Sequence, residues 1–395
     1  AKLDSLINAK DKVPFKIFDK KNAEKLFGKN LNISASQLEK FNLCRFSYFC
    51  NYGLNVRERQ RAEINPMQYG TIVHYILERF FGEYTKEEYL SLEEDKFQKI
   101  VCAYLAEYAV KYFGEEQLES NSFTYRLKTI LDNVMYLMKH IMEELSQSEF
   151  FVADCELKIG EDIPSYTIVL PDGHKIAVCG SVDRVDIMQR ADITYLRIID
   201  YKTGTKQFKL SDILYGINLQ MLLYLHSIEA SGGDKYGEIV PAGILYMPET
   251  FPYISSDSLK SIDKLPDELN KKLKMNGLLL KDTEIIHGMD KTDVATYIPV
   301  KIKAGEPVSS TSLATLAEFG KIFKKVDMLI AEMGKNIYNG NIEAKPLKGG
   351  HDSCEYCPYD SVCAYRQSNP ITCFSVDNKA VIEEITNEIN GKEEE

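Results

Sequence analysis

The 395-residue sequence lacks any apolar run that approaches the roughly 20 residues of a membrane-spanning helix. Its first segment, AKLDSLINAKDKVPF, is too polar for a secretory signal peptide. We therefore expect an intracellular protein, located in the cytoplasm, with no membrane partner. The chain begins with Ala in place of Met, which suggests either an excised fragment or a trimmed form of the protein.

Other features are missing as well. The sequence has no internal repeat and no G-x-x-x-x-G-K-[ST] phosphate loop, so it does not hydrolyse ATP by that route. It lacks an excess of basic residues, because 48 Lys and Arg stand against 59 Asp and Glu, for a net charge of −11. This charge argues against a protein that coats nucleic acid, although acidic metal ligands in an enzyme would add to the same count.

The order of the expected elements predicts the fold class. Apolar residues at three- and four-residue intervals predict helices near 86–113 and 122–148, and the runs that follow predict strands. We expect an α/β fold in which helices flank a mixed central sheet. The expected parts are a lead-in segment (1–30), one domain (31–366) with a helical insertion (about 86–148) and a core (about 150–250), and a tail (367–395).

A charged hairpin interrupts the strand region at residues 180–204, GSVDRVDIMQRADITYLRIIDYKTG. Side chains two residues apart share one face of a strand, so Asp200 and Lys202 point the same way. A hairpin centred in the QRAD segment would place Asp183 directly opposite Asp200. Two carboxylates would then reach one divalent cation beside an ammonium group. Mg²⁺ prefers such oxygen ligands and keeps waters that a substrate phosphate can replace.

The same pattern has a structural interpretation. The charges of a surface hairpin can pair across the strands, each pair contributing roughly 0.2–1 kcal/mol. Asp186 fits this second interpretation, because it lies out of register with Asp183. We expect Asp186 to have a structural partner, either Arg184 or Arg197.

Two further segments favour the catalytic interpretation. GTIVHY places Gly70 four residues before His74 at the start of an expected helix. A lone histidine is more often packed or capping than a ligand. LQMLLYL places Gln220 and Tyr224 four residues apart, on one face of an otherwise apolar helix. A polar pair in that position indicates a helix face directed at a site.

Taken in order, G-x3-H, G-x2-D-R, I-D-Y-K-T-G and Q-x3-Y resemble the RecB-type branch of the PD-(D/E)xK nucleases. The resemblance implies that His74, Asp183 and Asp200 bind the metal, Mg²⁺ or Mn²⁺, and that Lys202 is their catalytic partner. It also implies that Gln220 and Tyr224 support the site or meet DNA. Glu156, on the preceding strand, is a weaker candidate, for which a structural ion pair is an equal expectation.

The cysteines form a second constellation, SCEYCPYDSVC, in which Cys354, Cys357 and Cys363 lie close enough in sequence to hold a metal or cluster. The nine cysteines are an odd number, and without a signal peptide a disulfide framework is not expected. Spacing alone favours a zinc site and leaves the fourth ligand open. The candidates for the fourth ligand are Cys373, Cys44 and Cys50.

The segment SASQLEKFNLCRFSYFCNYGL resembles the first part of the iron–sulfur nucleases, in which one upstream cysteine joins a C-terminal trio. The resemblance implies a 4Fe–4S cluster held by Cys44, Cys354, Cys357 and Cys363. Such a cluster would join distant parts of the chain as a staple.

The resemblance reaches over residues 20–366 to the nuclease domains of AddAB-type helicase–nucleases, which resect double-strand breaks. It implies cleavage of single-stranded DNA delivered by an AddA-like motor subunit. Two alternatives stay open: a freestanding iron–sulfur exonuclease of the CRISPR-associated type, and a catalytically silent DNA-binding module. Ser181 and Arg45 stand where the resemblance leads us to expect Arg and Pro.

Overall fold

The computed structural model describes residues 16–57, 66–114, 120–202, 207–249, 265–309, 311–363, 365 and 370–393. Its centre is a mixed six-stranded sheet with the strand order β11-β8-β7-β6-β5-β2. The β6–β7 and β11–β8 pairs are parallel, and the other pairs are antiparallel. The strands of this sheet are β2 (Phe151–Ile159), β5 (Gly180–Arg190), β6 (Ile193–Lys202), β7 (Glu238–Pro248), β8 (Asn276–Leu280) and β11 (Leu313–Ala314).

Smaller sheets lie around this centre. One has the order β1-β4-β3, and the pairs β9–β10 and β12–β13 form two more. Their strands are β1 (Asn30–Ile33), β3 (Thr167–Val169), β4 (Lys175–Val178), β9 (Lys301–Lys303), β10 (Glu306–Val308), β12 (Leu347–Gly349) and β13 (Ile371–Cys373).

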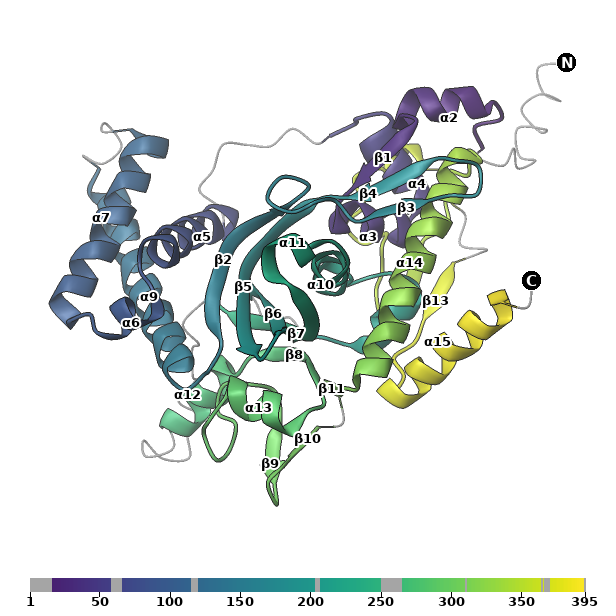
Figure 1. Ribbon diagram of the computed structural model, residues 1–395. Helices are drawn as coiled ribbons and strands as arrows, with labels where there is room; N and C mark the ends of the chain where they lie inside the picture. Colours follow the sequence, from purple (N-terminus) through teal and green to yellow (C-terminus); the bar gives the residue numbers. More distant parts are fainter. Residues whose placement is uncertain are drawn as a thin grey trace, which may run out of the picture.

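Helices cover the central sheet, as the sequence predicts for an α/β fold. In Figure 1, α10 lies against the sheet with α14 beyond it, and α5, α6, α7 and α9 form a separate group beside β2. The helices of these two groups are α5 (Pro66–Glu83), α6 (Lys86–Leu90), α7 (Glu94–Phe113), α9 (Asn121–Ser146), α10 (Gln220–Ser231) and α14 (Leu316–Tyr338). The remaining helices are α2 (Lys20–Phe27), α3 (Ala35–Leu43), α4 (Arg45–Tyr48), α11 (Gly233–Tyr236), α12 (Leu265–Leu273), α13 (Thr283–Met289) and α15 (Asn378–Glu393), with short π and 3₁₀ turns at Phe49–Gly53, Leu210–Tyr215 and Asp360–Val362.

Local chemistry explains where several helices begin. Ser34 caps α3 in a capping box with Gln37, so that each side chain binds the other's backbone N–H. The expected helix at 86–113 is two helices, α6 and α7, because the chain leaves helical geometry at Ser91 and restarts after Glu93. The lead-in segment also contains a helix, α2, whose first turn Asp19 caps.

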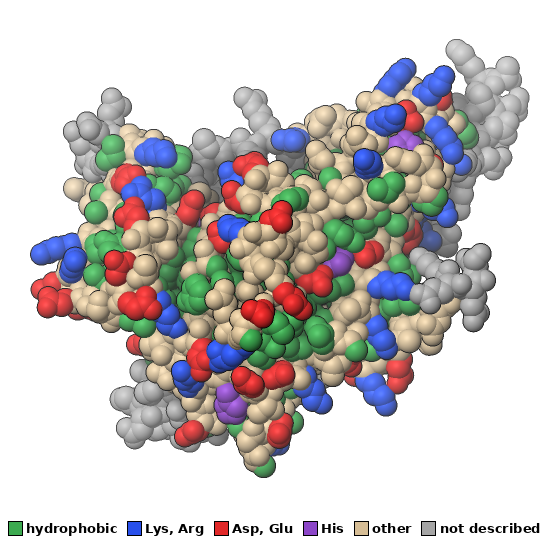
Figure 2. Space-filling view, in the orientation of Figure 1, with side chains coloured by type: hydrophobic (Ala, Val, Ile, Leu, Met, Phe, Trp, Pro, Cys, Tyr) green, Lys and Arg blue, Asp and Glu red, His purple; other side chains and the backbone are tan. Residues whose placement is uncertain are grey.

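The apolar residues of the sheet, α5, α9, α10 and α14 form one continuous core. On the face shown in Figure 2, basic side chains gather near α2, whose Lys20, Lys21 and Lys25 are exposed. In the part of the chain that the structure describes, no helix is both long and apolar enough to span a bilayer. The chain crosses from β6 through α10 to the parallel strand β7. The end of β6, the start of α10 and the end of β7 therefore lie close together, and the charged hairpin lies at this place.

Candidate active site

The hairpin has the register that the sequence predicts. In the antiparallel β5–β6 pair, Arg184 lies opposite Ile199 and Val185 opposite Ile198, so one further step brings Asp183 level with Asp200. Asp183 Oδ2 also accepts a hydrogen bond of 3.0 Å from the backbone N–H of Tyr201. The strand pairing itself therefore fixes the positions of the two carboxylates.

Asp183 belongs to a cluster of three side chains that come from three elements. His74 extends from α5, with its Nδ1 atom 2.8 Å from Glu156 Oε1 and its Nε2 atom 3.7 Å from Asp183 Oδ2. The ligand atoms of His74, Glu156 and Asp183 all lie within 4.8 Å of one another, a spacing that one metal ion could bridge. Ser181 Oγ donates a 2.9 Å hydrogen bond to the other oxygen of Glu156, which holds that carboxylate in place.

Glu156 reaches this cluster through an unusual backbone conformation. Its φ angle is +51°, in the left-handed region that non-glycine residues seldom adopt, although it lies within strand β2. The β2–β5 register sets Leu157 opposite Val182 and Cys155 opposite Arg184, so Glu156 is level with Asp183. Such backbone strain gathers at functional sites. Sequence reasoning leaves an ion-pair role for Glu156 as an equal expectation, because side-chain pattern does not reveal backbone strain.

Asp200 has a different set of partners. Its Oδ2 atom lies 2.6 Å from the Lys202 ammonium, and Gln220 Nε2 donates to its Oδ1 atom at 3.4 Å. Among the described residues, Asp200 is outside the group whose ligand atoms lie within 4.8 Å of one another. The structure thus brings together His74 and Asp183, with Glu156 as the third member, and sets Asp200 beside Lys202. Thr203 and Gly204 of the I-D-Y-K-T-G segment lie outside the described residues.

Tyr224 lies one turn beyond Gln220 on α10 and packs against the glycine of the hairpin. A Cβ atom at Gly180 would lie 2.2 Å from the Tyr224 hydroxyl oxygen. Burial raises the pKa of Tyr224 to about 12, so the hydroxyl stays protonated at neutral pH. In the structure Tyr224 supports the strand that carries Asp183.

The charges of the cluster are not balanced without a cation. Burial and the nearby charge of Asp200 raise the pKa of Asp183 to about 7. Burial lowers the pKa of His74, but its hydrogen bond to Glu156 and the charge of Asp183 outweigh this and raise that pKa to about 9. A proton on His74 therefore offsets part of the negative charge of these carboxylates, as a bound metal ion would.

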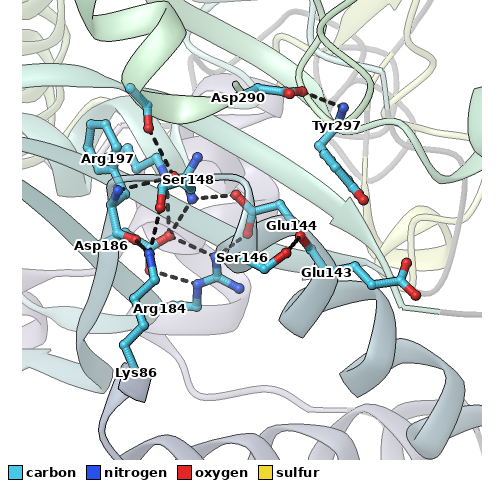
Figure 3. Close-up of polar contacts among 12 residues, drawn as sticks. Lys86, Glu143, Glu144, Ser146, Ser148, Arg184, Asp186, Arg197, Asp290 and Tyr297 are labelled. Carbon is cyan, nitrogen blue, oxygen red and sulfur yellow. Dashed lines mark hydrogen bonds and ion pairs between the residues drawn. The ribbon is translucent and has the colours of Figure 1, made fainter. Parts of the chain in front are cut away.

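A network of ionised side chains lies behind the hairpin (Figure 3). Arg184 donates to both oxygens of Asp186 at 2.7 Å, and Arg197 donates to Asp186 Oδ2 at 2.9 and 3.0 Å. Glu144 of α9 accepts from Arg184 at 3.1 Å and from Arg197 at 2.6 Å. All four side chains are fully buried. The expectation of a structural partner for Asp186 is confirmed, and it has both candidates.

Tyr201 connects this network with the cluster. Its hydroxyl accepts a 3.3 Å hydrogen bond from Arg184 Nη1, and its ring meets the His74 ring edge-on at 5.8 Å between centroids. The charged network therefore holds Tyr201 in place, and His74 packs against Tyr201.

Glu249 is a charged residue of this region that the sequence motifs do not reveal. It follows the last residue of β7, is 3% exposed, and interacts electrostatically with His74, Lys202 and Asp200. Its one sequence signal is a glutamate placed directly after an apolar strand, AGILYMP, beside the strand that ends in Lys202.

The cysteines meet at a separate place. Cys44, Cys354, Cys357 and Cys363 all line one small pocket. Cys50 is buried nearby but does not line this pocket. Cys373 packs in another cluster, with Ile217 and Leu347. Tyr359, within the C-terminal cysteine segment, donates to the carbonyl of Val56 at 2.8 Å, which ties the two distant segments together.

Comparison with known proteins decides the family. The PD-(D/E)XK nuclease superfamily model matches residues 32–364. The chain belongs to this superfamily. The six-stranded mixed sheet flanked by helices, with the charged hairpin at its centre, is thus the PD-(D/E)XK nuclease fold, as the sequence predicts.

Curated relatives narrow the comparison. The chain is 34% identical over 354 residues to a protein of Thermoanaerobacter sp. strain X514 that is named as a subunit of an ATP-dependent helicase/deoxyribonuclease, covering 87% of this chain and 30% of that protein. It is 35% identical over 397 residues to the protein of the same name from Clostridium kluyveri, covering 96% of this chain and 34% of that protein. The chain spans about a third of the length of these relatives.

Proposed function

We propose that this chain is a metal-dependent deoxyribonuclease module that hydrolyses phosphodiester bonds of single-stranded DNA. The observation that carries the proposal is the meeting of His74, Glu156 and Asp183 within 4.8 Å, next to the Asp200–Lys202 pair on the adjoining strand. Membership of the PD-(D/E)XK superfamily and the word deoxyribonuclease in the relatives' names support it. DNA as the substrate also agrees with the cytoplasmic location expected from the sequence.

The residues of the site fit a hard divalent cation, Mg²⁺ or Mn²⁺, because carboxylate oxygens and an imidazole nitrogen are suitable ligands. His74, Asp183 and Asp200 would hold it, with Glu156 as an added ligand. When bound, the cation supplies Lewis-acid polarisation of a phosphoryl oxygen and lowers the pKa of a water molecule.

The remaining side chains have roles of position and charge. Lys202 orients the attacking water or offsets charge that develops on the phosphate. Gln220 holds Asp200 through Oδ1 and leaves Oδ2 on the Lys202 side. Tyr224 packs against Gly180 and so fixes the strand that carries Asp183.

The test is cleavage of end-labelled single-stranded DNA by the purified chain with Mg²⁺ or Mn²⁺. We expect Asp200→Ala and Lys202→Ala to lower the cleavage rate by roughly 10²–10⁴-fold, the usual effect of removing a catalytic group. Lys158→Ala is the matched control, because Lys158 lies on β2 near Glu156 and its side chain is 57% exposed. Active-site variants that cut as fast as the wild type would contradict the assignment.

We further propose that Cys44, Cys354, Cys357 and Cys363 hold a 4Fe–4S cluster. Their place around one pocket supports this set, and thiolates are the donors that such clusters take. Because spacing alone favours zinc, the choice of a cluster rests on the resemblance to the iron–sulfur nucleases.

The test is the iron and acid-labile sulfide content of anaerobically prepared protein. Cys44→Ser should lose iron, whereas Cys50→Ser should keep it. A colourless, zinc-loaded protein that is folded and active would contradict the cluster.

We also propose an AddA-like motor subunit as the partner that delivers DNA. The support is the name of the relatives, which joins a helicase to a deoxyribonuclease, and the fact that this chain matches only about a third of their length. If the proposal holds, adding such a subunit and ATP should let the chain degrade duplex DNA that it does not cut alone.

A further inference from the structure

The backbone of Glu249 is fixed on two sides. Its N–H donates a 3.1 Å hydrogen bond to the carbonyl of Lys202, across the parallel β6–β7 pair. Its own carbonyl accepts a 3.1 Å hydrogen bond from the Tyr69 hydroxyl of α5. Glu249 is therefore tied to the residue that carries the site's ammonium group and to the helix that carries His74.

Its side chain is buried without a complete set of partners. The residue is 3% exposed, and Oε2 has no hydrogen-bond partner within the described parts of the chain. Burying a carboxylate that lacks a partner costs several kcal/mol, so such a group is kept only where something compensates it. Burial raises the pKa of the Glu249 carboxyl, and a cation that came close to it would stabilise its charged form.

The neighbouring groups narrow the choice of that cation. Among the residues that the structure describes, the charged groups that act on the Glu249 carboxylate are His74, Lys202 and Asp200. Both ring nitrogens of His74 already face other carboxylates, those of Glu156 and Asp183. Asp200 is an acid and repels Glu249. Lys202, whose flexible side chain is 29% exposed, is the cation that can move.

Binding of a divalent cation would displace the Lys202 ammonium from Asp200. Its ammonium lies 2.6 Å from Asp200 Oδ2, on a carboxylate that would help to hold the divalent cation. A bound cation would repel the ammonium from that oxygen, because two like charges so close inside a protein interact strongly. We propose that Glu249 is a positioning residue that receives the Lys202 ammonium from Asp200 when a divalent cation binds, an inference that rests on the proposed nuclease function.

The glycine of the G-x3-H segment leaves room for this carboxylate. A Cβ atom at Gly70 would lie 3.7 Å from Glu249 Oε1, so any side chain longer than that of alanine would press on it. Gly70 and His74 are one helical turn apart on α5. The segment thus provides both a group of the metal cluster and the space for the lysine's acceptor.

The first experiment separates rate from affinity in the full chain. Glu249→Gln keeps the shape of the side chain and removes its charge. We expect it to lower kcat by about 10- to 100-fold, the usual loss when a supporting residue of a site is removed, with KM for single-stranded DNA and the affinity for Mn²⁺ unchanged. Glu249→Asp should restore part of kcat. Glu238→Gln, an exposed glutamate at the start of β7, is the control and should have no effect.

A second measurement does not depend on activity. Ca²⁺ is added to the protein, and acetylation of Lys202 by an amine-reactive ester is followed at fixed pH by peptide mass spectrometry. In the wild type, Ca²⁺ should leave the acetylation rate of Lys202 almost unchanged, since Glu249 receives the ammonium. In Glu249→Gln, Ca²⁺ should raise that rate about tenfold, as expected for loss of one charge-assisted hydrogen bond.

The outcomes are distinguishable. If Ca²⁺ raises the acetylation rate of Lys202 equally in the wild type and in Glu249→Gln, the role of Glu249 is overturned. The nuclease proposal is left standing. Loss of Mn²⁺ affinity in Glu249→Gln would also overturn it, because Glu249 would then be a metal ligand. A wild type that protects Lys202 as expected but cuts no DNA would support the role of Glu249 and contradict the proposed function.

Discussion

Gly180 and Tyr224 are in direct contact: a Cβ atom at position 180 would lie 2.2 Å from the tyrosine hydroxyl oxygen and 2.5 Å from the ring carbon that bears it. Two segments that are about forty residues apart in the sequence, G-x2-D-R and Q-x3-Y, therefore meet at one point. Position 180 is glycine because a larger side chain would collide with Tyr224. Tyr224 in turn packs against the strand that carries Asp183.

Gly180→Ala should therefore damage both stability and cleavage. The new methyl group has to displace Tyr224 or shift β5, and overpacking of this kind costs about 1–3 kcal/mol. Urea unfolding and DNA cleavage measure the two effects. Combining Gly180→Ala with Tyr224→Leu should recover part of the lost stability. Gly320→Ala, at a position of α14 with open space around it, should not destabilise the protein. Additive losses in the double variant would show that the two residues are not coupled.

Two aspartates of one strand should respond oppositely to the same change. Asp183→Asn should abolish cleavage without loss of stability at pH 8, because burial and Asp200 raise the pKa of Asp183 to about 7 and so disfavour its ionised form. Asp186→Asn should destabilise the fold by about 3–5 kcal/mol, because Arg184 and Arg197 lose a buried counter-charge. Urea unfolding compares the variants. A destabilised Asp183→Asn with a stable Asp186→Asn would reverse the assignment.

Glu156→Asn should lower activity and relieve backbone strain. Asparagine adopts the left-handed backbone region more readily than glutamate, so relief of the strain at φ +51° should offset about 1 kcal/mol of the stability lost with the His74 and Ser181 contacts. Cleavage should fall at least about tenfold, since the shorter neutral side chain leaves His74 and the cation site. Thermal unfolding and cleavage are measured together. Ala191→Asn, with φ +49° in the β5–β6 turn, is the control and should gain stability with activity intact.

His226 should make stability depend on pH. Its ring lies between those of Tyr166 and Phe323, and its Nε2 atom is 3.0 Å from Asp327 on α14. Burial lowers the pKa of His226, but the hydrogen bonds to Asp327 and Glu229 outweigh this and raise it to about 9.

Because the pKa of an unfolded histidine is about 6.5, the stabilisation from His226 should be complete below pH 6.5 and should be lost as pH rises through 9. The measurement is the free energy of unfolding in urea at pH 6, 7.5 and 9.5 for wild type and His226→Gln. The gap between them should narrow as pH rises, and a gap that widens would contradict the sign.

The hairpin shows which parts of the site can be predicted from the sequence. Side-chain period and turn position set the register of Asp183 and Asp200, because strand alternation leaves no freedom once one pair is known. The need of Asp186 for an arginine partner follows from the cost of burying a charge. The contribution of Glu144 does not, because a helix forty residues earlier has to dock before it can reach Arg184.

Other features depend on tertiary structure alone. The carboxylate of Glu249 enters the site because a strand ends beside Lys202, and no residue pattern marks that end as functional. The strained backbone of Glu156 is equally invisible, since glutamate is common in strands of ordinary geometry. The α/β fold class was predictable because long periodic segments favour one element type, whereas the split between α6 and α7 depends on three residues.

The buried network also limits how the protein can be divided. Residues 86–148 are an insertion beside the nuclease core. Their last helix nevertheless brings the Glu144 carboxylate, which forms ion pairs with Arg184 and Arg197 in the central sheet. A fragment cut at the start of β2 would keep every proposed catalytic residue except His74 and would still carry two guanidinium groups in its interior facing one aspartate. The insertion and the core therefore share one buried charge network, and neither has a complete set of ion pairs without the other.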